Sequence, residues 1–200
     1  MKKTLSEMTL GELWELFPVI LLGHNSQYKI WYETEKKSIL KNINADDVVR
    51  INHIGSSAVK GLIAKPTVDI LLEVDGGCDV LRLVDDLIAV GWGLMKKENQ
   101  PMKISLSKGY TPDGYADRVF HLHIRYFGDW SELYFRDYLI EHTDIADEYG
   151  KLKLQLFNDF KHNRDGYTEA KTDFVLKYSE IAKCEFKNKY RPRFVICENT

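Results

Sequence analysis

Apolar positions at the start of the chain repeat with the spacing of an α-helix. Thr9 followed by Glu12 is typical of a helix N-terminus, and Pro18 ends or restarts the helix. The apolar residues at this spacing are Leu10, Leu13, Trp14 and Phe17. The same periodicity resumes over residues 26–42 and predicts a second helix. We therefore expect a helical leader over residues 9–42.

The period changes to that of β-strands in the middle of the chain. Residues 48–54 (VVRINHI) and 67–74 (TVDILLEV) are rich in β-branched and apolar residues, and the second stretch gives the strongest strand signal. Residues 79–90 have an amphipathic pattern closed by Gly91, which predicts a helix. Shorter strands are expected at residues 92–95, 102–107 and 119–126.

After Gly128 the pattern is helical almost to the end of the chain. The expected helices cover residues 131–141, 144–161 and 168–183. This order of elements predicts an α+β fold, with a small mixed sheet, flanking helices against one face and a helical C-terminal lobe. We expect one domain over residues 1–200, and its parts after the leader are a sheet-rich core at 46–127, a helical lobe at 130–183 and a loosely docked tail at 184–200.

Charge and cysteine content exclude several classes of protein. The 200 residues include 28 Lys and Arg against 30 Asp and Glu, and this near balance argues against general nucleic-acid binding. Because the sequence contains no run of about 18 apolar residues, no membrane span is predicted. Cys78, Cys184 and Cys197 are far apart and form no C-x-x-C pair, so we expect reduced thiols in a cytoplasmic protein. The oligomeric state stays open.

A Gly-Ser turn between the first two predicted strands is the most informative stretch for chemistry. Gly55, Ser56 and Ser57 offer backbone N–H groups and hydroxyls that suit a phosphate. The next strand brings Asp69 near this turn, where a carboxylate is suited to hold Mg²⁺ beside substrate phosphates. Alternatively, Asp69 only caps its strand or pairs with Lys65.

Two histidines on a later strand form a second candidate group. Strand alternation places His121, His123 and Arg125 on the same face. The residues expected to face the core are Phe120, Leu122 and Ile124. If this strand neighbours that of Asp69, the three side chains form a site that favours Zn²⁺, Mn²⁺ or Fe²⁺, because imidazole suits these metals. The alternative is a polar sheet face on which the histidines bond to Tyr or Asp.

Basic residues are candidates for neutralising phosphate charge. Lys65 lies between the turn and the strand and is the best placed. Arg136, next to an aspartate on a predicted helix, fits a structural ion pair equally well. Tyr167 and Lys171 lie one helical turn apart and face either a cleft beside the helical lobe or solvent. For Lys153 a solvated helix face is the favoured interpretation.

Three blocks of the sequence, in order and with fitting spacing, carry a family resemblance. The first is GSSAVKGLIAKPTVDILLEV at residues 55–74, and the second is VFHLHIRYFGDWSELYFRDYL at residues 119–139. The third spans residues 149–171, with Tyr149, Leu152-Lys153 and Tyr167-x-x-Ala-Lys171. Together they resemble the GrpB family of the nucleotidyltransferase superfamily, and the similarity extends over roughly residues 9–180.

The resemblance implies a nucleotidyltransferase-type fold, with a Gly-Ser turn, an Asp-x-Asp or Asp-x-Glu pair on a strand and a third carboxylate on a neighbouring strand. Gly55 and Ser56 match the turn, and Asp69 matches the first metal carboxylate. Leu71 stands at the next ligand position and cannot bind metal, a loss that GrpB-like proteins generally share. Lys60 replaces the proline common in the family and adds positive charge near the turn.

Three functions follow as hypotheses. The first is a nucleotidyltransferase-like protein that acts on or binds a nucleotide or phosphorylated small molecule, with Asp69, Lys65 and Arg136 as catalytic residues and a divalent metal (Mg²⁺, Mn²⁺ or Zn²⁺). Its ligand contacts would be Gly55, Ser56, Ser57 and Lys171. The second is a non-catalytic module for a nucleotide or coenzyme A-related molecule, because Leu71 interrupts the metal pattern and family members occur fused to dephospho-coenzyme A kinase. The third is a metal-dependent hydrolase built on Asp69, His121 and His123.

Overall fold

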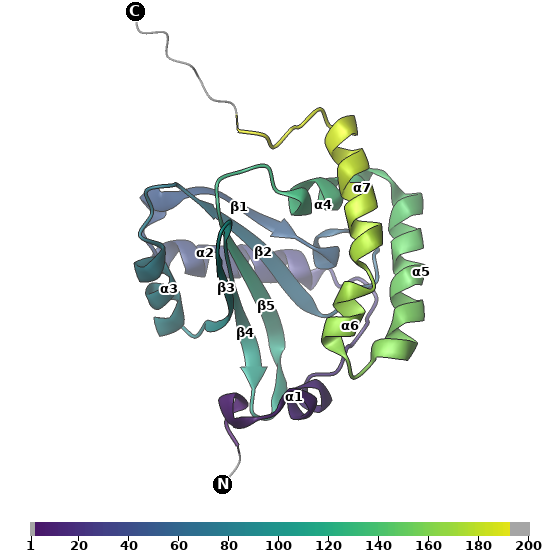
Figure 1. Cartoon of the computed structure of the whole chain (residues 1–200), viewed down its shortest axis with the longest axis horizontal. Helices are drawn as coiled ribbons and strands as arrows, with labels where there is room; N and C mark the ends of the chain where they lie inside the picture. Colours follow the sequence, from purple (N-terminus) through teal and green to yellow (C-terminus); the bar gives the residue numbers. More distant parts are fainter. Residues whose placement is uncertain (1–2, 193–200) are drawn as a thin grey trace, which may run out of the picture.

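The computed structural model describes residues 3–192, in which a mixed sheet lies between two groups of helices (Figure 1). The strands are β1 (Val48–Ile54), β2 (Thr67–Val74), β3 (Gly93–Asn99), β4 (Met102–Thr111) and β5 (Gly114–Tyr126). The α-helices are α1 (Leu10–Leu16), α2 (Gln27–Asn42), α3 (Val80–Ala89), α4 (Ser131–Glu141), α5 (Thr143–Phe160), α6 (Arg164–Glu169) and α7 (Thr172–Glu185). The predicted α+β class, with a mixed sheet and a helical C-terminal lobe, is confirmed.

The strands of the described residues form one five-stranded sheet in the order β1-β2-β5-β4-β3. β2 and β5 run parallel, and every other neighbouring pair is antiparallel. In the parallel register Asp69 lies opposite His121, and Leu71 lies opposite His123. The strand of the two histidines therefore neighbours the strand of Asp69.

One face of the sheet packs against α2 and α3 and forms the main hydrophobic core. Ile70 and Leu72 of β2 are fully buried there, and Leu122 of β5 lies beside them. Helix α3 turns Leu83 and Leu87 toward the same core, because its apolar residues recur at the period of a helix. Burying each such side chain contributes about 1.5–3 kcal/mol to the stability of the fold. Because these apolar residues face the core, the polar residues that alternate with them lie on the opposite face of the sheet.

The opposite face carries the polar residues of β2 and β5 next to the C-terminal helices. Leu71 is fully buried on this face against Ile54 and Leu133, the latter from α4. The side chains of Asp69 and His123 on the same face remain 27% exposed. Figure 1 shows α4 to α7 gathered beside the sheet, across the molecule from α3.

The boundaries of three predicted elements differ from those in the structure. The single helix expected over residues 168–183 is two helices, because α6 begins at Arg164 and ends before Lys171. Asn163 starts this extra helix, since its side chain accepts a hydrogen bond from the backbone N–H of Gly166 at 2.9 Å. The strands expected at 102–107 and 119–126 also continue further, because β4 and β5 pair through polar residues as far as Thr111 and Gly114.

The described part of the predicted tail, residues 184–192, is partly buried to exposed and contacts the rest of the domain through Tyr190 among others. Helix α7 continues to Glu185, and the ring of Tyr190 lies 5.0 Å from the Arg50 guanidinium. The backbone N–H of Tyr190 also donates a hydrogen bond to the Tyr134 hydroxyl at 2.9 Å. Positions 193–200, which include Cys197, lie outside the described residues. Within residues 3–192, no helix is long and apolar enough to cross a membrane.

Candidate functional site

The Gly-Ser turn sits directly against the carboxylate of Asp69. Gly55 has a φ of +70°, a backbone conformation that side-chain-bearing residues rarely adopt. A Cβ atom at this position would lie 2.5 Å from Oδ2 of Asp69, closer than real Cβ contacts. Glycine is therefore required both by the turn and by the close approach of the acid.

The two serines after this glycine lie on different sides of the turn. The Ser57 side chain is buried and its Oγ lies 3.0 Å from Nε2 of His53, whose ring stacks on Tyr32. Burial lowers the pKa of His53 to about 4, which favours its neutral form. The Ser56 Oγ instead accepts a hydrogen bond from Nζ of Lys153 at 3.1 Å. Of the two hydroxyls, that of Ser56 is thus the one that contacts a lysine.

Asp69, His121 and His123 form a compact group with the donor set of a metal site. One ligand atom of each residue lies within 4.8 Å of the other two. Oδ1 of Asp69 is 3.1 Å from Nδ1 of His121 and 3.9 Å from Nε2 of His123. The alternation predicted for β2 and β5 accounts for this convergence, because both strands present these residues on one face.

Hydroxyl groups hold the outer nitrogens of both histidines. Nε2 of His121 lies 2.8 Å from the Tyr110 hydroxyl, and Nδ1 of His123 lies 3.4 Å from Oγ of Ser105. The Tyr110 hydroxyl in turn accepts a hydrogen bond from Nη2 of Arg164 at 2.8 Å. Because a hydroxyl both donates and accepts, it supports either tautomer of the ring, including the one that leaves the inner nitrogen free for a metal.

The pKa shifts of Asp69 and His121 fit metal binding. Burial raises the pKa of Asp69, but the hydrogen bond with His121 and the nearby ring of His123 lower it by more, and the result lies well below the usual range. Burial lowers the pKa of His121, and the neighbouring carboxylate offsets this only in part. An ionised carboxylate beside a neutral imidazole is the state in which both side chains coordinate a cation. These residues therefore fit a divalent metal, and the two imidazoles favour Zn²⁺, Mn²⁺ or Fe²⁺ over Mg²⁺.

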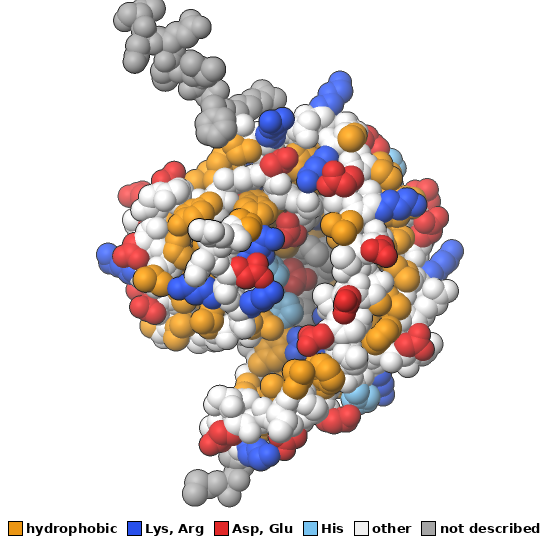
Figure 2. All heavy atoms as spheres, viewed as in Figure 1, with side chains coloured by type: hydrophobic (Ala, Val, Ile, Leu, Met, Phe, Trp, Pro, Cys, Tyr) orange, Lys and Arg blue, Asp and Glu red, His pale blue; other side chains and the backbone are white. Residues whose placement is uncertain are grey.

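A cavity of about 620 Å³ opens over this group, and we call it the basic pocket. Its basic side chains are Lys65, Lys153, Arg164 and Lys171. Its other lining residues include the Gly55 turn with Ser56 and Ser57, the Asp69 group, Tyr149, Tyr167, Asp165 and Glu169. Figure 2 shows this hollow between the sheet and the C-terminal helices, with histidine side chains at its floor.

Three lysines of the basic pocket have lowered pKa values. Burial, together with the charge of Lys171 and Lys65, lowers the pKa of Lys153 to about 7. Burial and Lys65 likewise lower the pKa of Lys171 to about 7, although Asp69 opposes this shift. The pKa of Lys65 is also lowered, chiefly by burial and then by Arg164. The pocket thus gathers positive charge that its own carboxylates leave incompletely compensated.

One of these lysines, Lys153, lies elsewhere than the sequence predicted. Lys153 is 2% exposed and lies 4.6 Å from the Tyr149 ring centre, so the solvated helix face expected for it was wrong. Lys171 lies 4.3 Å from the Tyr167 ring centre, and both residues line the pocket. In each pair a tyrosine precedes the lysine by four positions, and this repeated spacing was a usable signal. Tyr110 and Arg164 had no comparable signal.

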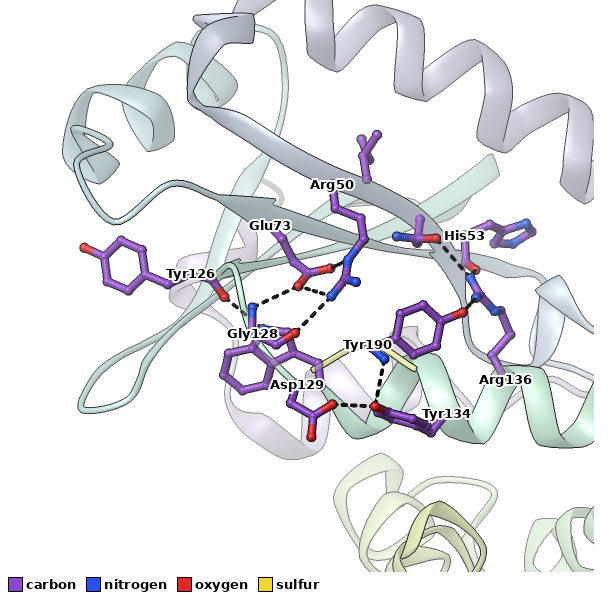
Figure 3. Close-up of polar contacts among 12 residues, drawn as sticks. Arg50, His53, Glu73, Tyr126, Gly128, Asp129, Tyr134, Arg136 and Tyr190 are labelled. Atoms are coloured by element: carbon purple, nitrogen blue, oxygen red, sulfur yellow. Dashed lines mark hydrogen bonds and ion pairs between the residues drawn. The ribbon is translucent and has the colours of Figure 1, made fainter. Parts of the chain in front are cut away.

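Arg136 lies apart from the basic pocket, in a separate polar network (Figure 3). Its guanidinium binds Asp137 Oδ1 at 2.8 Å, the backbone oxygen of His53 at 3.0 Å and the Tyr190 hydroxyl at 2.9 Å. The structure therefore brings together the predicted residues of the turn, Asp69, both histidines and two of the lysines, but not Arg136. Lys60 is exposed and does not line the pocket either.

Comparison with known proteins identifies relatives along most of the chain. The Glutamate-rich protein GrpB of Alkalihalophilus pseudofirmus is 32% identical over 161 residues, which cover 78% of this chain and 91% of that protein. The UPF0157 protein PA4798 of Pseudomonas aeruginosa is 35% identical over 128 residues, 64% of this chain, and the match spans about half (52%) of its length. The crystal structure of the conserved protein GrpB from Enterococcus faecalis matches with a TM-score of 0.74 and 27% identity, over 84% of this chain and 99% of that chain. Since the model of the GrpB protein family also matches residues 18–180, the chain belongs to the GrpB family.

Proposed function

We propose that the basic pocket binds a nucleotide or another phosphorylated small molecule together with a divalent metal ion. One observation carries this proposal: a three-ligand group of Asp69, His121 and His123 lines the same cavity as one buried and three partly buried basic side chains. Anionic phosphate oxygens are the ligands that satisfy both a metal ion and such cations. The proposed function is nucleotidyltransferase-like because a Gly-Ser turn followed by an aspartate on a strand is the pattern of that superfamily.

The basic side chains support a phosphate ligand more than a neutral one. Charging Lys153 and Lys171 is unfavourable without a bound anion, since burial and the charges of nearby lysines lower the pKa of each to about 7. A bound phosphate would favour the charged forms and would raise both pKa values. Arg164, which already orients Tyr110, offers a further cation at the same wall. Binding should therefore be accompanied by proton uptake near neutral pH.

In this proposal the metal supplies a Lewis acid that polarises a phosphate oxygen. Asp69, His121 and His123 would hold the ion, and Tyr110 and Ser105 would orient the two imidazole rings. The Gly55 turn would supply backbone N–H groups to the phosphate. Lys65, rather than Arg136, is the basic side chain that we expect to act with Asp69.

Leu71 favours a second candidate, a module that binds its ligand without transferring any group. The side chain is fully buried against Ile54 and Leu133, so the second carboxylate position of nucleotidyltransferases is filled by core packing. Two-metal transfer needs several carboxylates, and this strand offers one at the pocket. Two imidazoles as ligands also keep the metal-dependent hydrolase open, because they suit a single transition-metal ion.

Thermal-shift measurements with pyrophosphate and ADP, each with and without Mg²⁺, Mn²⁺ or Zn²⁺, test the proposal. We expect metal-dependent stabilisation in the wild type and its loss in Asp69→Asn. Lys171→Met should abolish stabilisation by pyrophosphate, whereas Lys177→Met, an exposed lysine on α7 outside the pocket, should not. Unchanged metal-dependent binding in Asp69→Asn would refute the site. Release of phosphate from nucleoside triphosphates by the wild type would separate an enzyme from a binding module.

A further inference from the structure

A second cavity, of about 560 Å³, opens beside the basic pocket. The two cavities share five lining residues, namely Gly55, Ser56, Asp69, His123 and Tyr149. These include the Gly-Ser turn and two members of the candidate metal group. A metal ion on this group would therefore lie where the two cavities meet.

The walls of the second cavity are largely apolar and aromatic, and we call it the apolar pocket. Its apolar lining residues are Ile54, Trp130, Phe135, Tyr149, Val175 and Leu176. Its further polar residues are Lys103, Asp129, Ser131, Glu132 and Ser179. This composition, several apolar surfaces with a few polar groups, is typical of small-molecule sites, and it contrasts with the lysine-rich basic pocket.

The aromatic wall of the apolar pocket is held in place by the protein itself. The indole N–H of Trp130 donates a hydrogen bond to the backbone oxygen of Tyr126 at 2.9 Å. The Phe135 ring packs edge-on against Tyr149, with ring centres 5.2 Å apart. Because these rings are fixed before any ligand arrives, little conformational entropy is lost when another flat group packs against them.

Apart from the shared Asp69, two carboxylates and one lysine, Lys103, give the walls of the apolar pocket a net negative charge, which disfavours a second anionic group. Asp129 and Glu132 both line it, and Asp129 accepts a hydrogen bond from the Tyr134 hydroxyl at 2.6 Å. Carboxylates repel phosphate, but they accept hydrogen bonds from ring N–H and amino groups. The two cavities thus differ in the part of a ligand that each can take.

From this arrangement we infer that one elongated ligand spans both cavities, with its phosphates in the basic pocket and a flat, uncharged heteroaromatic ring in the apolar pocket. This inference rests on the proposed function, and it narrows the ligand to ring-bearing phosphate esters of the nucleotide class. Each cavity lies within the range of about 300–1,000 Å³ found for ligand pockets, and together they exceed what phosphate alone would fill. The shared residues then lie at the phosphate nearest the organic group.

A pair of ligands and a pair of variants test this inference. Calorimetric titrations with Mn²⁺ present would compare pyrophosphate, which carries no ring, with ADP. We expect ADP to bind the wild type at least about tenfold more tightly, because its ring buries apolar surface. Leu176→Asp should remove this advantage while leaving pyrophosphate affinity unchanged. Leu176 is 56% exposed, so the variant should fold.

Ile181→Asp is the matched control, because Ile181 is a 39% exposed apolar residue of the same helix and lines neither cavity. It should bind both ligands like the wild type. Quenching of Trp130 fluorescence by ADP, absent in Trp130→Phe and absent with pyrophosphate, would support the inference without any change to Leu176. Equal affinity of the wild type for the two ligands, or an undiminished ADP advantage in Leu176→Asp, would overturn it. Failure of pyrophosphate itself to bind would instead overturn the proposed function.

Discussion

Lys153 is a buried cation whose removal should stabilise the ligand-free protein. It is 2% exposed, and its Nζ donates hydrogen bonds to Oγ of Ser56 at 3.1 Å and to the backbone oxygen of Ile63. Burial, with the positive charges of Lys171 and Lys65 nearby, lowers its pKa from 10.5 to about 7. Lys153→Met keeps much of the side-chain volume and removes the charge.

The pKa shift sets the magnitude and the sign of the effect. A shift from 10.5 to about 7 corresponds to about 5 kcal/mol of stability lost at pH values below 7, where both folded and unfolded lysine are charged. This penalty shrinks as the pH rises from 7 toward 10.5, because folded Lys153 is then neutral while the unfolded chain still binds the proton. Loss of the two hydrogen bonds costs the variant about 1–2 kcal/mol. Lys153→Met should therefore be more stable than the wild type by about 3 kcal/mol at about pH 6, and close to it at about pH 9.5.

Urea denaturation of both proteins at the two pH values measures this difference in the free energy of unfolding. Lys151→Met is the matched control, because Lys151 is an exposed lysine on the same helix, and its stability should differ little from the wild type at either pH. Lys153→Met should also lose affinity for pyrophosphate, because the charge of Lys153 would bind the anionic ligand. A Lys153→Met protein that is less stable than the wild type at about pH 6, or a difference that does not change with pH, would refute the reasoning.

Three further changes probe other parts of the structure. Gly55→Ala should destabilise the protein by at least about 1–2 kcal/mol in urea denaturation, because it meets a positive φ and the Asp69 carboxylate together. Tyr110→Phe should weaken metal affinity by about tenfold in calorimetry, because the outer nitrogen of His121 loses its partner, while the far-UV circular dichroism stays unchanged. Arg136→Met should cost about 3 kcal/mol of stability, because it breaks a largely buried ion pair, yet leave pyrophosphate affinity unchanged.

Local periodicity was enough to predict the strands that carry the site. The apolar run at 67–74 and the alternation around His121 and His123 gave both strands and the faces of their side chains. The pairing of these two strands depends on contacts between distant parts of the chain. The sequence therefore predicted each strand but not that the two are neighbours. The position of Lys153 was missed for the same reason, because tertiary packing decides whether a helical lysine is buried.

Tyr110 and Arg164 show where pattern reasoning ends. Tyr110 lies in the part of β4 beyond the predicted end of that strand, where no apolar alternation marks it. Arg164 is the first residue of α6, a helix that was expected to start later. Both contribute through a single hydroxyl that joins the guanidinium to the ring of His121. Such contacts depend on where two elements meet in space, and residue type alone does not predict them.

The packing of α4 explains why β2 offers one acid to the pocket. On the site face of this strand, Asp69 is followed by Leu71, which lies under Leu133 of α4. The next residue on that face, Glu73, is fully buried in an ion pair with Arg50, with N–O distances of 2.5 and 2.6 Å. A carboxylate at position 71 would be buried beneath α4, out of reach of a metal ion in the basic pocket. The free-energy cost of its desolvation would therefore not be offset by pairing with that ion. In the proposed site, the imidazoles of the neighbouring strand would take the place of further acids, and such a ligand set would favour one transition-metal ion over a pair of Mg²⁺ ions.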